Sequence, residues 1–178
     1  MATTVYLTRH GQTEWNSRGR MMGWADEDVN ALGRAQAMRL ARRMENLRLE
    51  AVYTSPLKRA LTTGAIIGQS HELSPQPVRG LIEINYGDWE GLPADVVADR
   101  WPELRTAWQE DPARVRPPHG ENGLLLARRA RSFLGELTGV TRDASPRVSG
   151  HRVAERGTRG PRHALPSDAC PSRSPVTT

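Results

Sequence analysis

The chain has 178 residues, a length that suits one domain with a hydrophobic core. No apolar run approaches the roughly 18 to 20 residues that a membrane-spanning helix needs, which argues against a membrane partner. The net charge is +5, but residues 1–140 carry 18 basic against 17 acidic side chains, and residues 141–178 carry 7 against 3. The basic excess therefore lies in the last segment, which has no aromatic residue to stack on bases, so we do not expect a nucleic-acid partner.

The apolar pattern of the first 80 residues predicts strands that alternate with helices. Short β-forming runs occur at Val5–Leu7, Ala51–Tyr53 and Gln76–Val78, and apolar residues recur at helical spacing over 32–47 and 57–67. Asn30 is placed to cap the first helix, and Ser55-Pro56 to begin the second. This alternation predicts an α/β fold with a mainly parallel sheet.

The segment from Gly87 to Pro118 is rich in tryptophan, proline and acids, and we expect it to leave the sheet and cover a site. Trp101, Leu104 and Trp108 predict one helix over 94–109, and a further apolar period predicts a helix over 126–137. Residues 141–178 hold five of the 13 prolines and few large apolar side chains. We therefore predict a domain over 1–140 and a disordered tail over 141–178.

The N-terminus and the single cysteine bear on location. Residues 1–7 have no basic region and no long apolar stretch, so they do not resemble a signal peptide. Cys170 has no second cysteine to pair with, which fits a reducing compartment. We expect a cytoplasmic protein, and nothing in the sequence indicates its oligomeric state.

Four residues outside the apolar pattern could carry chemistry: Arg9, His10, Arg59 and Glu83. Arg9-His10-Gly11 follows the first expected strand, where α/β sheets place ligands, and a neutral imidazole beside a guanidinium could take up a phosphoryl group. Arg59 falls in the first turn of the second helix, where helix N-termini already favour anions. Taken singly, each pattern also fits a solvated surface residue.

Glu83 lies between Ile82 and Ile84 in the run LIEINYG. A carboxyl in apolar company has a raised pKa, which suits a general acid. The alternative is an exposed acid on an alternating strand.

Three blocks in this order resemble the histidine phosphatase (phosphoglycerate mutase-like) superfamily. They are VYLTRHGQTEWNSRGRMMGWADEDVNALGRAQA, VYTSPLKRALTTG and LIEINYGDWEG, and the resemblance runs over residues 4–137. It implies a three-layer α/β/α sandwich, incomplete at its C-terminus. The short length and the YGDWEG block are more similar to the family's phosphatases than to its longer mutases.

The resemblance also implies roles for individual residues. His10 matches the histidine that becomes phosphorylated, and Arg9, Arg59 and Asn16 match residues that bind the phosphate. Glu83 matches the proton donor to the leaving group. The family needs no metal or other cofactor, and we expect none, since no metal-ligand spacing occurs in the sequence.

The family's fourth block, an apolar strand that ends in a second histidine and glycine, has no clear match. Val148-Ser149-Gly150-His151-Arg152 has one large apolar residue before its histidine, and the surroundings of His163 fit no better; His119 precedes the last matching helix. Without that strand, we expect unpaired strand edges and uncovered apolar helix faces. A shift of the reading frame near residue 140 would explain the change, and a degenerate family member is the rival explanation.

The resemblance therefore predicts a phosphoric monoester hydrolase of the histidine acid phosphatase type. Its substrate would be a small phosphorylated metabolite, and its reaction metal-independent through a phosphohistidine. The alternatives are a phosphoglycerate mutase and a catalytically impaired phosphate-binding protein that lacks the second pocket histidine.

Overall fold

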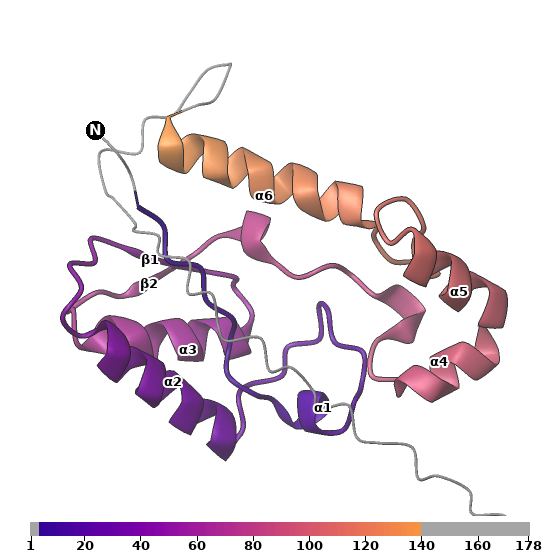
Figure 1. The fold of residues 1–178 in the computed structure, drawn as a ribbon, viewed down its shortest axis with the longest axis horizontal. Coiled ribbons are helices and arrows are strands. Elements are labelled where there is room, and N and C mark those ends of the chain that lie inside the picture. Colours follow the sequence, from indigo (N-terminus) through magenta and orange to yellow (C-terminus); the bar gives the residue numbers. More distant parts are fainter. Residues whose placement is uncertain (1–3, 140–178) are drawn as a thin grey trace, which may run out of the picture.

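The computed structural model describes residues 4–139 (Figure 1). The elements in chain order are α1 (Glu14–Ser17), α2 (Ala31–Met44), β1 (Val52–Thr54), α3 (Lys58–Gln69), β2 (Pro75–Pro77), the 3₁₀ helices η1 (Arg79–Leu81) and η2 (Gly87–Trp89), α4 (Ala94–Arg100), α5 (Pro102–Glu110) and α6 (Gly123–Thr138). The sequence features at 141–178, including His151, His163 and Cys170, lie outside the described residues.

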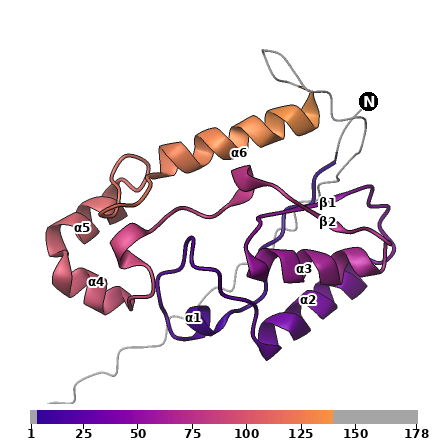
Figure 2. The ribbon, with the colours of Figure 1, turned by 180° about the vertical axis from the view of Figure 1, so that it is seen from behind.

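Strands β1 and β2 form a parallel pair in which Val52 lies opposite Pro75 and Thr54 opposite Pro77. Two of the three β2 residues are prolines, which have no N–H to donate, so β2 suits the edge of a sheet. Helices α2 and α3 lie on one side of the strands and α6 on the other (Figures 1 and 2). This is the predicted α/β arrangement with a parallel sheet between helical layers.

The expected first strand, Val5–Leu7, is not hydrogen-bonded as a strand within the described residues. Leu7 is 91% exposed, whereas Tyr6 packs against the core of Ala41, Met44 and Ile67. The run has the predicted β propensity, but a strand also needs a neighbour, and neither β1 nor β2 pairs with it. The strand prediction for this segment is therefore wrong for the described part of the chain.

Of the two predicted helix starts, one is confirmed and the other is not. Asn30 caps α2, since its side chain accepts a hydrogen bond of 2.9 Å from the Gly33 amide. Helix α3 begins later than expected, with Leu57 at the cap position and no side-chain cap. The Ser55 hydroxyl instead accepts a 3.3 Å bond from the Leu57 amide, so the predicted Ser-Pro start is wrong.

The predicted helix over 94–109 is two helices, α4 and α5, which meet at Trp101 (φ −136°, ψ 60°). Pro102 disfavours the α conformation at the residue before it, which explains the break. The two helices lie at the opposite end of the molecule from α2 and α3 (Figures 1 and 2). Trp89, which is fully buried, lies 5.8 Å from Trp108 and 6.4 Å from Trp101 between ring centroids, so this end has an aromatic core of its own.

Helix α6 presents its apolar face to the gap between the N-terminal segment and β1. The residues of this face lie at helical spacing: Leu126, Ala130, Phe133, Leu134 and Leu137. No residue of α6 is buried against the described part of the chain, and Leu134 is 45% exposed. Within the described residues this face is therefore only partly covered, which agrees with the expected lack of a covering strand.

Candidate functional site

Four of the five predicted site residues line one cavity of about 580 Å³: Arg9, His10, Arg59 and Glu83. The cavity continues from these residues between segment 5–9 and β1, beneath the apolar face of α6. It therefore combines a charged end with a long apolar wall.

The His10 ring is oriented by its own backbone. Its Nδ1 lies 2.7 Å from the carbonyl oxygen of Gly11. Because a carbonyl can only accept, Nδ1 carries the hydrogen, which leaves the lone pair of a neutral ring on Nε2. Nε2 is therefore the ring atom that could act as a nucleophile.

The loop that carries His10 is fixed by α3 and α2. The Gly11 amide donates a buried 3.1 Å bond to the Thr63 hydroxyl, which itself donates a 2.7 Å bond to the Arg59 carbonyl. A Cβ on Gly11 would lie 2.3 Å from the Gly33 carbonyl oxygen, and one on Gly33 would lie 2.1 Å from that of Gln12. Both positions require glycine because the two backbones are in contact.

Burial lowers the pKa of His10 below its ordinary value of 6.5 because it disfavours the charged ring. The bond to Gly11 opposes this shift, while the positive charges of Arg59 and Arg9 lower the pKa further. The negative charge of Glu83 raises it. The balance favours a neutral imidazole, the form that can attack phosphorus.

Arg59 is 2% exposed, and its two Nη atoms hold the loop after Met22. Nη1 donates to the Ala25 carbonyl at 2.7 Å and Nη2 to the Gly23 carbonyl at 2.6 Å. Each Nη carries two hydrogens, so each retains a second one for an anion. A buried, fixed guanidinium is suited to hold phosphate oxygens.

Glu83 is exposed, while Ile82 and Ile84 on either side of it are 9% and 6% exposed. The alternation of buried and exposed residues is as expected, but the exposed carboxyl of Glu83 is not surrounded by apolar side chains. Its Oε1 accepts a 2.8 Å bond from the Ile84 amide. The role of general acid stays a prediction, based on its place in the cavity.

Asn16 does not line the cavity with the other four residues. Its side chain accepts a 3.1 Å bond from the Thr13 amide, and its own amide donates to the Thr13 hydroxyl, which closes a capping box at α1. Its contact with phosphate stays a prediction.

Sequence reasoning missed several residues that hold the site in place. The Glu90 carboxylate accepts bonds from the amides of Trp24 and Ala25, both 2.6 Å, and of Tyr86 at 3.2 Å. Loop 23–25 is thus held through its amides by Glu90 and through its carbonyls by Arg59. Thr63 had a sequence signal, because it lies four residues after Arg59 and so on the same helix face. Glu90 had none.

Residues 4–139 contain neither a candidate metal site nor a candidate membrane-spanning helix. No group of three or more His, Cys, Asp or Glu side chains there is arranged to hold a metal ion. Likewise, no helix in that range has both the length and the apolar character to cross a membrane.

Comparison with known proteins identifies the family. Residues 5–156 match the histidine phosphatase superfamily (branch 1). The chain is 34% identical over 133 residues to phosphoserine phosphatase 1 of Hydrogenobacter thermophilus, an alignment that covers 75% of this chain and 63% of that protein. It is 35% identical over 128 residues to the 2,3-bisphosphoglycerate-dependent phosphoglycerate mutase of Bartonella tribocorum, with 68% and 62% covered.

Among solved structures, a mycobacterial glucosyl-3-phosphoglycerate phosphatase in complex with VO3 superimposes with a TM-score of 0.73 at 32% identity. The match covers 78% of this chain and 66% of that one. The chain spans about three fifths of the length of the curated relatives it matches. The predicted phosphoglycerate mutase-like α/β fold is confirmed, and the chain belongs to the histidine phosphatase superfamily, branch 1.

Proposed function

We propose that the chain is a phosphomonoesterase that acts on small phosphorylated metabolites through a phosphohistidine on His10. The observation that carries this proposal is the state of His10: Nδ1 is bonded to the Gly11 carbonyl, the pKa is lowered by burial, and two arginines adjoin it in the cavity. The family and its phosphatase relatives support the same reaction.

The reaction would run in two steps. His10 Nε2 attacks phosphorus in line, the P–O ester bond breaks, and Glu83 gives its proton to the leaving alkoxide. Arg9 and Arg59 stabilise charge on the three phosphoryl oxygens. Glu83, now a carboxylate, takes a proton from water, whose oxygen attacks phosphorus while the N–P bond breaks.

The substrate class follows from the site and the relatives. The cavity joins a charged end to an apolar wall, and the relatives are named for phosphoserine and glucosyl-3-phosphoglycerate. We therefore propose a small organic phosphate, hydrolysed without a metal in the cytoplasm, where small phosphorylated metabolites occur. Because one relative is a phosphoglycerate mutase, isomerisation of a phosphoglycerate without net phosphate release is the second candidate.

Hydrolysis of p-nitrophenyl phosphate in EDTA tests the proposal, with His10→Ala beside the parent chain. His71→Gln is a matched control, because His71 follows the far end of α3, about 18 Å along a 12-residue helix from the end that carries Arg59. We expect activity that survives EDTA, disappears in His10→Ala and persists in His71→Gln, with an acid-labile phosphoryl label on the parent chain and on His71→Gln but not on His10→Ala. A folded parent chain that binds phosphate but releases none would be an impaired binding protein instead.

A further inference from the structure

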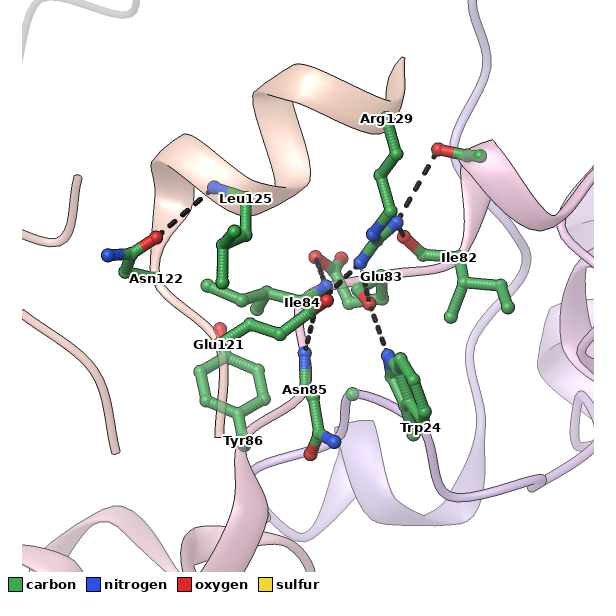
Figure 3. Close-up of polar contacts among 12 residues, drawn as sticks. Trp24, Ile82, Glu83, Ile84, Asn85, Tyr86, Glu121, Asn122, Leu125 and Arg129 are labelled. Atoms are coloured by element: carbon green, nitrogen blue, oxygen red, sulfur yellow. Dashed lines mark hydrogen bonds and ion pairs between the residues drawn. The ribbon is translucent and has the colours of Figure 1, made fainter. Parts of the chain in front are cut away.

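The side chain of Arg129 on α6 donates hydrogen bonds to backbone carbonyls of the segment that ends at Glu83 (Figure 3). Its Nη1 donates to the carbonyls of Gly80, at 3.4 Å, and of Ile82. Its Nη2 donates to the Glu83 carbonyl at 3.0 Å. One guanidinium therefore holds three carbonyls of a four-residue stretch that ends at the proposed general acid.

Glu121 extends this hold to the other side of Glu83. Its Oε2 accepts a 2.7 Å bond from Arg129 Nη2 and a 3.1 Å bond from the Asn85 amide. The Glu121 amide donates a 2.8 Å bond to the Asn85 carbonyl. The side chains of Arg129 and Glu121 are 23% and 20% exposed, so water screens the pair less than a surface ion pair.

The Glu83 carbonyl receives a second donor, the indole Nε1 of Trp24, at 3.0 Å (Figure 3). Trp24 belongs to the loop that Arg59 and Glu90 hold, so the backbone of Glu83 connects α6 to the phosphate end of the cavity. The Glu83 carboxylate accepts from the adjacent Ile84 amide, a bond that moves with the segment. The place of the carboxyl is therefore set by the backbone that Arg129 binds.

We infer that Arg129 is a positioning residue for Glu83, and this inference rests on the proposed function. A general acid must come within about 2.6–3.2 Å of the leaving oxygen, and a displacement of about 1 Å can cost about 100-fold in rate. Arg129 touches neither His10 nor the phosphate arginines in any contact found in the structure. It therefore acts on the reaction through the backbone of Glu83.

The hydrogen bonds of Arg129 can be removed without removing the contacts that pack α6 against the rest of the chain. A Cβ on Gly80 would lie 2.9 Å from the Arg129 carbonyl, and the rings of Phe133 and Tyr53 meet edge to face at 5.2 Å. These contacts depend on the backbone of α6 and on Phe133. Arg129→Met keeps them and the apolar stem of the side chain while it removes all the donors.

The test compares two leaving groups. Nitrophenolate departs without a proton, whereas an alkoxide needs the general acid, so we would measure p-nitrophenyl phosphate and glycerol 2-phosphate with Arg129→Met, Arg129→Lys and the control Arg128→Met. Arg128 is exposed and adjacent. We expect kcat/KM for glycerol 2-phosphate to fall about 10- to 100-fold in Arg129→Met, with a much smaller fall for nitrophenyl phosphate, because kcat/KM reports phosphoryl transfer to His10 and not the later hydrolysis that both substrates share. Lysine should restore part of the loss.

Equal losses of kcat/KM on both substrates would overturn the inference, because they would place the effect outside proton donation to the leaving group. Hydrogen exchange at the Ile84 and Asn85 amides provides a readout that does not need activity. Faster exchange in Arg129→Met than in Arg128→Met is expected, and unchanged exchange overturns the inference. A parent chain that hydrolyses neither substrate would overturn the proposed function, while exchange would still decide whether Arg129 holds the segment.

Discussion

Thr63 offers a sharp test of how the His10 loop is held. Thr63 is 4% exposed. Its hydroxyl accepts a 3.1 Å hydrogen bond from the Gly11 amide and donates a 2.7 Å bond to the Arg59 carbonyl. Thr63→Val keeps the shape of the side chain and removes both bonds. Thr63→Ser keeps the hydroxyl and removes one methyl group.

The two substitutions should differ in cost. Valine leaves the buried Gly11 N–H without a partner, which costs about 1–3 kcal/mol, whereas the Arg59 carbonyl lies inside α3 and keeps its helical bond. Serine loses the transfer free energy of one buried carbon, about 0.8 kcal/mol. We therefore expect Thr63→Val to be the less stable variant, and to lose activity as well because the loop that carries His10 is released.

Urea unfolding of the two variants and the parent chain measures the difference, with hydrolysis of p-nitrophenyl phosphate as the second readout. Serine should retain most of the activity at every urea concentration at which the chain is folded. If Thr63→Val proved as stable and as active as the parent, the Gly11 bond would not hold the loop, and the reasoning would be refuted.

Two further predictions concern ionisation and packing. Because burial lowers the pKa of His10, an NMR titration of the folded chain should give a midpoint below 6.5. The contribution of His10 to the free energy of unfolding should be fully present above the unfolded-state pKa. It should fall as the pH drops below that pKa towards the folded-state value, since protonation then favours the unfolded chain. A titration midpoint at or above 6.5 would contradict this prediction. Trp89→Ala should cost about 3–5 kcal/mol, because Trp89 is fully buried against Trp101 and Trp108. Thermal unfolding checks it, and a cost below about 1 kcal/mol would mean that the aromatic core carries little stability.

Elements with a strong local signal could be predicted from the sequence. The apolar period indicated α2, α3 and α6, and the side chain of Asn30 marked the start of α2. Pro102 is a sequence signal for the break at Trp101. The prediction of one helix relied instead on the helical spacing of the apolar residues, which continues across the break. Val5–Leu7 could not be decided locally, since pairing depends on a neighbouring strand.

The residues of the candidate site also differ in whether they have a local sequence signal. Arg9, His10, Arg59 and Glu83 were predicted from motifs, and in the structure all four line one cavity. The supporting contacts could not be found, because they join residues far apart in the sequence. Arg129 binds carbonyls 46 to 49 residues before it, and backbone carbonyls have no sequence signature.

The contact of Gly11 with Gly33 has a consequence for how the substrate range of this protein could change. At this contact no side chain separates the His10 loop from α2, so neither glycine can be replaced without moving the loop. Positions whose side chains line the cavity, such as Leu126 and Leu134 of α6, can instead change in size without moving a backbone. A library that randomises these α6 positions would explore new substrates while His10 stays in place.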